Sequence, residues 1–229
     1  MERSIFRICK KYKANGVKDD NKETAIMRLW TIQPESFYQT LRERGIIYCD
    51  REGYWCKHNR LMYDWLVEQM RQRIGNPPLP QIRYPLWAWY QYHSRKRPRP
   101  PKTPLKKGDE CSIYLEIEIP DNEVVLTDFS LWVNCLNGWQ TQTDRELEHS
   151  IKTYEAKVGK YCHLNEYPED IQQGIIKTWQ SIFDLKFRDR EWSPWAWWNR
   201  SIQATFWCLK IEQVVNVDFV GKERDEKVL

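Results

Sequence analysis

The sequence lacks the features that mark several large classes of protein. It contains only nine glycines in 229 residues, and they form no Gly-rich fingerprint of a phosphate-binding loop. No stretch approaches the roughly 20 apolar residues of a membrane-spanning helix. The N-terminus, MERSIFRICKKYK, is basic but has no apolar segment of a secretory signal. These absences argue against a P-loop or Rossmann nucleotide site, and they predict no contact with a membrane.

Paired cysteines are also missing. The seven cysteines are an odd number without a framework spacing, which predicts free thiols and a cytoplasmic protein. Cys49, Cys56 and His58 lie close in sequence, but their spacing differs from that of the paired cysteines in structural zinc sites. No flanking sequence marks a cysteine as a nucleophile. We therefore expect no metal site, and we expect most of the thiols to be buried.

Aromatic side chains, by contrast, are abundant, with thirteen tryptophans and twelve tyrosines. Trp and Tyr bury a large apolar area but carry a polar atom that needs a hydrogen-bond partner. The sequence therefore predicts either a core with hydrogen-bonded aromatic edges or a cleft lined by aromatic rings. The chain length suits one medium domain.

Hydrophobic periodicity predicts strands and helices in an irregular order. The predicted strands are residues 27–33, 84–92, 111–120, 201–210 and 214–219, with a further short strand at 124–126. The predicted helices are residues 34–44, with Pro34 at the first position, 60–74 and 129–136, one helix capped by Thr143 and one that starts at Pro168. Because strands do not alternate regularly with helices, we expect a single α+β domain with a central mixed or antiparallel sheet and helices packed on it. We place this domain at residues 27–220, between an N-terminal extension at 1–26, which could be disordered, and a charged tail at 221–229.

The stretch YPLWAWYQYHSRKRPRPPK, residues 84–102, changes from aromatic to basic halfway along. Its first half has two apolar faces, which is typical of a strand in the interior of a sheet. Its second half opens a basic, Pro-rich loop at 93–110, since proline cannot donate to a sheet ladder. Aromatics beside arginines could also grip nucleic acid, but here the two kinds are segregated. We therefore favour a core strand followed by a mobile loop, whose basic residues include Arg95, Lys96, Arg97, Arg99 and Lys102.

The carboxylates give only weak indications of a catalytic site. Glu116 and Glu118 share one face of a predicted strand and could act as an acid and a base, although an exposed strand face usually carries charges anyway. The cap of the helix that follows is Thr127 or Asp128, and for Asp128 this role is simpler than a catalytic one.

Several blocks of sequence, in order, carry a resemblance to a known family. MRLWTIQP, YDWLVEQMRQRIG, YPLWAWYQY, LEIEIPDNEVVLTDFSLWVNCLN and SIQATFWCLKIEQV make the chain similar to a bacterial family called domain of unknown function 3841, from about Met27 to Phe219. The resemblance implies a single prokaryotic cytoplasmic domain that starts near Met27. The family carries no assigned activity to transfer.

The layout also resembles ADP-ribosyltransferase and RNA phosphotransferase folds. Arg28 could take the role of their first-strand Arg or His, and Trp87, Trp89 or Tyr90 that of their middle-strand aromatic. The expected late-strand Glu is missing, because the strand at 201–210 offers Gln203 instead. Layout does not establish function.

Three functions remain open at this point. The first is a ligand-binding or interaction domain, with an aromatic-lined cleft between the sheet and the 60–74 helix that takes a small molecule or a protein. The residues expected there are Arg28, Gln33, Tyr63, Gln69, Arg73, Trp87, Trp89, Gln91 and Gln203, although several could merely satisfy the edges of buried Trp and Tyr. The second is an NAD-dependent ADP-ribosyltransferase-like enzyme of a toxin or phage-defence type, the only hypothesis that needs a cofactor. The third is nucleic-acid binding through the basic loop, with steep salt dependence.

Overall fold

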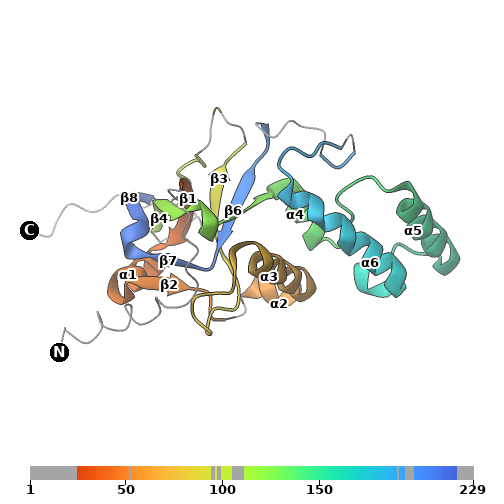
Figure 1. Cartoon of the computed structure of the whole chain (residues 1–229), viewed down its shortest axis with the longest axis horizontal. Coiled ribbons are helices and arrows are strands. Elements are labelled where there is room, and N and C mark those ends of the chain that lie inside the picture. Colours follow the sequence, from red (N-terminus) through yellow and green to blue (C-terminus); the bar gives the residue numbers. More distant parts are fainter. Residues whose placement is uncertain are drawn as a thin grey trace, which may run out of the picture.

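The computed structural model describes residues 25–51, 53–93, 96, 99–104, 111–189, 191–193 and 199–220. The molecule has a sheet at one end and a pair of helices at the other (Figure 1). Most of the predicted extension at 1–26 and all of the tail at 221–229 lie outside the described residues. Within the described part of the chain, no helix is long and apolar enough to cross a membrane.

The central sheet has six strands, all paired with antiparallel neighbours. The strands are β1 (Ile26–Pro34), β3 (Leu86–Gln91), β4 (Ser112–Pro120), β5 (Val125–Asp128), β6 (Ile202–Phe206) and β8 (Val214–Val220). Their order is β5-β6-β3-β1-β4-β8. The predicted α+β class is confirmed, and the sheet is antiparallel rather than mixed. The aromatic strand β3 lies between β6 and β1, so its predicted interior position is also confirmed.

One face of the sheet is covered by helix α1 (Glu35–Arg44) and a small second sheet of β2 (Ile46–Tyr48) and β7 (Cys208–Lys210). Leu29 and Ile117 from the sheet pack there with Leu41 of α1 and Leu209 of β7. Gly45 ends α1 with a φ of 72°, a left-handed conformation that glycine adopts at little cost. Apolar burial thus fixes this side of the domain.

The predicted single strand at 201–210 is wrong, because the chain changes sheets at Trp207. β6 ends at Phe206, and the next three residues pair with β2 instead. The buried Trp207 side chain lies at this break, where its Nε1 donates to the Gly75 carbonyl, 3.0 Å away. Continuous alternation in the sequence cannot reveal such a change of partner. The short elements β2 and α2 (Tyr54–His58) were not predicted either.

The other face of the sheet packs against α3 (Arg60–Ile74) and α4 (Phe129–Leu136). Tyr63 of α3 meets Trp87 of β3 and Trp132 of α4 edge-on, with ring centroids 6.3 and 5.5 Å apart. Trp87 and Trp132 themselves are 5.5 Å apart. Aromatic rings from three elements therefore fill the space between the sheet and these two helices.

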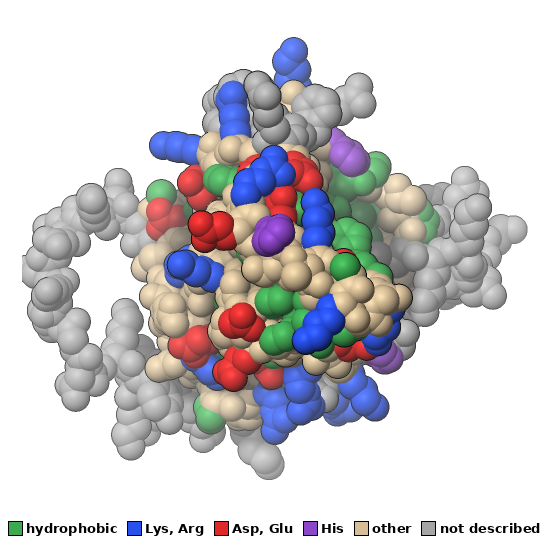
Figure 2. Space-filling model, turned by 90° about the vertical axis from the view of Figure 1, so that its right-hand side faces the viewer, with side chains coloured by type: hydrophobic (Ala, Val, Ile, Leu, Met, Phe, Trp, Pro, Cys, Tyr) green, Lys and Arg blue, Asp and Glu red, His purple; other side chains and the backbone are tan. Residues whose placement is uncertain are grey.

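Helices α5 (Arg145–Val158) and α6 (Glu169–Thr178) extend away from the sheet (Figure 1). The N-cap of α5 is Asp144, whose carboxylate accepts from the Leu147 amide at 3.0 Å. The predicted cap, Thr143, instead bonds to Asp189. The apolar stripe predicted for this helix continues past Thr178, where α6 ends. Its last residues lie in a 3₁₀ helix, Trp179–Phe183. Figure 2 views this end of the molecule and shows acidic and basic side chains interspersed with hydrophobic ones.

Candidate functional site

The residues predicted to line one cleft are spread over several places. Tyr63 and Trp87 lie in the aromatic core described above. Gln69 and Arg73 both bond to Gln180, at 2.9 and 3.0 Å, and so hold the Trp179–Phe183 turn against α3. Arg73 also lines a wide groove of about 730 Å³ beside β5. Of the predicted set, Arg73 is therefore the residue that lies at an open surface between α3 and the sheet.

The remaining predicted residues belong to the sheet. Gln33 donates to the Thr31 hydroxyl at 2.8 Å, and Gln91 donates to the Arg200 carbonyl at 2.8 Å. Trp89 lies directly opposite Gln203 in the β3–β6 pair. The structure does not bring these side chains together with Tyr63 or Arg73, so their role in binding stays a prediction.

Arg28 lies on the β1–β4 face of the sheet, between the two carboxylates singled out in the sequence. Its guanidinium is 2.5 Å from Glu118 and 3.2 Å from Glu116. The expectation that both glutamates are exposed is wrong for Glu116, which is buried. Arg28 and its two partners thus form an ion-pair network, in which opposite charges lie on neighbouring strands.

The basic loop contributes to the same network. Arg99 lies 3.8 Å from Glu116 and over the ring of Trp30, and Lys102 lies 2.6 Å from Asp218. Both side chains remain exposed, in line with the predicted solvated arm, although each lies beside an acidic residue of the sheet. The mobility of the arm stays a prediction. Lys96 is exposed, whereas Arg95 and Arg97 lie outside the described residues.

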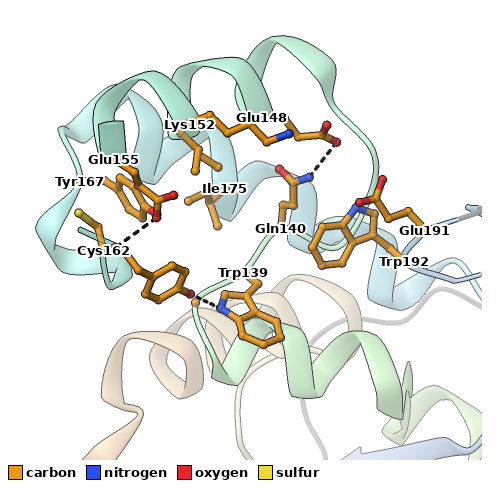
Figure 3. A pocket seen from close by; sticks show the side chains of 13 residues that line it. Trp139, Gln140, Glu148, Lys152, Glu155, Cys162, Tyr167, Ile175, Glu191 and Trp192 are labelled. Carbon is orange, nitrogen blue, oxygen red and sulfur yellow. Dashed lines mark hydrogen bonds between the residues drawn. The ribbon is translucent and has the colours of Figure 1, made fainter. Parts of the chain in front are cut away.

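A cavity of about 410 Å³ lies between α5 and α6, far from the predicted cleft. Figure 3 shows its walls: Glu148, Lys152 and Glu155 project from α5 along one side, with Ile175 of α6 opposite. Gln140 and Trp192 lie at one end of the cavity, and Cys162 and Tyr167 lie at the other. The volume falls within the usual range for small-molecule sites, about 300–1,000 Å³.

The α5 wall carries its polar residues at helical spacing. Positions 148, 152 and 155 are four and three residues apart, so they share one face of the helix. Sequence reasoning missed this site, because it used α5 only for its apolar stripe. The signal was present as a second, charged stripe beside Leu147 and Ile151, but such stripes are common on solvated helices.

Aromatic rings form the rim and one end of the cavity. Trp139 and Tyr161 are both exposed, and the Trp139 Nε1 donates to the Tyr161 hydroxyl at 2.5 Å. The buried Tyr167 donates its hydroxyl to Glu155 Oε1 at 2.6 Å, and the Cys162 amide donates to the same oxygen at 3.1 Å. The cavity therefore combines aromatic edges with a carboxylate that is held by neutral donors.

Two buried polar atoms at the other end have no partner. Gln140 is only 5% exposed, and its Nε2 donates to Glu148 at 3.2 Å, which directs its Oε1 elsewhere. That Oε1 and the Nε1 of Trp192 have no hydrogen-bond partner among the described residues. A buried polar atom without a partner costs about 1–3 kcal/mol. Both atoms belong to residues that line the cavity, but both are covered by protein atoms.

The titratable groups of the cavity favour binding over nucleophilic chemistry. Burial raises the pKa of the Cys162 thiol, which disfavours the thiolate that a nucleophile needs. Burial, and then the hydrogen bond to Glu155, raises the pKa of Tyr167, so this hydroxyl keeps its proton and remains a donor. The six cysteines of the described part of the chain are free thiols. Among the same residues, no group of three His, Cys, Asp or Glu side chains could hold a metal ion.

Asp189 holds the segment that carries Trp192. Its carboxylate accepts hydrogen bonds from Thr143 and from the amides of Glu191 and Trp192, all within 3.1 Å. Burial acts to raise the pKa of Asp189, but these hydrogen bonds outweigh burial and set the pKa below its ordinary value. Asp189 therefore ties the cavity wall to the start of α5 as long as it is ionised.

We expect Asp189→Ala to lower the free energy of unfolding by about 1–2 kcal/mol near neutral pH, since a hydrogen-bonded carboxylate is lost from a partly exposed site. Because the folded pKa lies below the unfolded one, this stabilisation is complete above the unfolded pKa, about 3.9. It declines as the pH falls through the folded pKa. Denaturant titrations of both proteins at several pH values measure the difference. A difference that grows on acidification contradicts this role.

Comparisons with known proteins give one match. No curated protein and no solved structure matches the chain. The model of one family, described as Domain of unknown function (DUF3841), matches residues 28–215, close to the limits predicted from the sequence. Because this match covers most of the chain, the protein belongs to the DUF3841 family.

Proposed function

We propose that the protein is a small-molecule-binding domain and that its ligand occupies the cavity between α5 and α6. The observation that carries the proposal is a cavity of about 410 Å³ with apolar walls and a few polar groups. Two residues at one end of it, Gln140 and Trp192, also contain buried polar atoms without a partner among the described residues. Natural proteins rarely leave buried polar atoms unsatisfied, and each exception calls for a water, an ion or a ligand.

The shape and lining of the cavity support a small organic ligand. Ile151, Ile175 and the rings of Trp139 and Trp192 supply apolar surface, and a few polar groups are placed around it. Three carboxylates and one ammonium line the walls, namely Glu148, Glu155, Glu191 and Lys152. An excess of negative charge disfavours phosphate-bearing ligands such as NAD in this cavity.

Ligand-observed NMR with a library of small aromatic and aliphatic fragments tests the proposal on the full chain. We expect fragments that bind to compete with one another, because they share one cavity. Ile151→Phe places a larger side chain in the cavity and is expected to abolish their binding. The matched control is Val215→Phe, which adds similar bulk at an exposed position of β8, at the opposite end of the molecule.

The variants separate the two possible outcomes. Fragments that bind the wild type and the Val215→Phe protein but not Ile151→Phe support the cavity as the binding site. Fragments that bind all three proteins equally place the site elsewhere, and the proposal is then wrong. Circular dichroism confirms that each variant is folded before its binding is compared.

A further inference from the structure

We propose that the ligand of the α5–α6 cavity is a small amine, with a protonated ammonium at one end and a hydroxyl-like group at the other. This inference rests on the proposed function, and it adds the chemical class and the orientation of the ligand. It follows from the difference between the two ends of the cavity, which Figure 3 shows along the length of α5.

Glu155 defines the end that takes the ammonium. Both of its hydrogen bonds come from neutral donors, the Tyr167 hydroxyl and the Cys162 amide, and both reach Oε1. The other oxygen, Oε2, has no partner among the described residues. The nearest cation on the same wall, Lys152, extends toward Glu148 (Figure 3), and no ion pair joins Glu155 to a cation among the described residues. A half-buried carboxylate with a free oxygen and no ion-pair partner attracts a positive group. Trp139 and Tyr161 add aromatic rings to the lining of the cavity, and aromatic rings can also attract a cation.

Glu148, seven residues earlier on the same helix, does not offer the same attraction. Its Oε2 lies 2.7 Å from the Arg145 guanidinium, and its Oε1 accepts from Gln140. The charge of Glu148 is therefore already balanced within the protein. Glu148 and Glu155 are the two α5 carboxylates that line the cavity, and one has an ion-pair partner while the other has none among the described residues, so they provide a pair for a test.

Gln140 and Trp192 define the end that takes the hydroxyl. Gln140 is 95% buried, and its free Oε1 can accept a hydrogen bond, while the free Trp192 Nε1 can donate one. A hydroxyl is both a donor and an acceptor, so it matches either atom. Both atoms are covered by protein, so a ligand reaches them only when a neighbouring side chain moves. The Cα atoms of positions 148 and 155 are about 10 Å apart along the helix, which separates the two ends by the length of a small aromatic amine.

Three probes of almost equal shape test whether the cavity prefers an amine. Tyramine carries the ammonium, 4-(2-hydroxyethyl)phenol replaces it with a neutral hydroxyl, and 4-hydroxyphenylacetate replaces it with a carboxylate. We expect tyramine to bind about tenfold more tightly than the neutral phenol, in line with hydrogen bonds to charged groups. The anion is expected to bind more weakly than either. Ligand-observed NMR titrations give the three dissociation constants.

Two conservative variants show which carboxylate causes the preference for tyramine over the neutral phenol. Glu155→Gln keeps an acceptor for Tyr167 and Cys162 but removes the charge, so the advantage of tyramine over the neutral phenol is expected to disappear. Glu148→Gln is expected to leave that advantage intact. An advantage that survives Glu155→Gln overturns the assignment of this residue.

The failure of this inference can be told apart from failure of the proposed function. If all three probes bind the wild type with equal affinity and Ile151→Phe removes them, the cavity is a binding site but its preference for an amine is wrong. If none of them binds and the fragment library also finds no ligand for the cavity, both proposals are wrong.

Discussion

Replacement of Asp128 by alanine is expected to lower the free energy of unfolding by about 4 kcal/mol. Asp128 is 1% exposed, and its Oδ2 lies 3.0 Å from the guanidinium of Arg200, which is also buried. Removal of one partner from a buried ion pair costs about 3–5 kcal/mol, because the other charge stays in a poorly solvated site. The other oxygen of Asp128 caps α4 by accepting from the Ser130 and Leu131 amides.

Asp144→Ala is the matched control for this prediction. Asp144 caps α5 in the same way, but it has no buried cation beside it, so its loss is expected to cost about 1 kcal/mol. Chemical denaturation measures both values, and the melting temperature of the Asp128 variant should fall by roughly 8–16 °C. Equal losses for the two variants would falsify the contribution of the Arg200 pair.

The second large effect is expected for Trp132→Ala, at about 3–5 kcal/mol. Trp132 is 3% exposed and packs between Tyr63 and Trp87, each at 5.5 Å between ring centroids. The substitution leaves a cavity at the point where α3, α4 and β3 meet. Rigid neighbours on three sides prevent this cavity from collapsing, so most of the packing energy is lost.

Trp139→Ala removes the same side chain from a position only a few residues away. Trp139 is 44% exposed, and its carbonyl, which accepts from Trp179, is retained in the variant. We expect a loss of no more than about 0.5 kcal/mol. Denaturant midpoints of the two variants give the comparison, and similar midpoints contradict the packing role of Trp132.

Local signals in the sequence predict much of the fold. Helix α3 was predicted at its observed limits, because a clear apolar stripe ends at Gly75. Thr127 or Asp128 was predicted as the cap of α4, and Asp128 is the cap. The partners of each strand could not be predicted, since pairing depends on contacts between distant residues. The break at Trp207 has the same cause: its bond to Gly75 spans 132 residues.

The candidate site was harder to predict than the fold. Gln69 and Arg73 are polar residues on a buried helix, which is a reasonable sign of a binding site. Both bond to Gln180, which lies more than 100 residues away, and this contact could not be predicted from the sequence. Arg73 also lines the groove beside β5, and a binding role for either residue stays a prediction. The cavity itself is assembled from separate segments between Gly138 and Trp192. No single segment carries a recognisable motif, so only their arrangement in space reveals the site.

The connection between β5 and β6 has a consequence for how relatives can diverge. Asp128 ends β5 and lies opposite Ile202 at the start of β6, so the chain leaves the sheet and returns to it at adjacent positions. Helices α4, α5 and α6, and with them the whole cavity, belong to this single connection between β5 and β6. Changes of length or sequence within this connection can therefore alter the whole cavity while the order of the six strands stays the same.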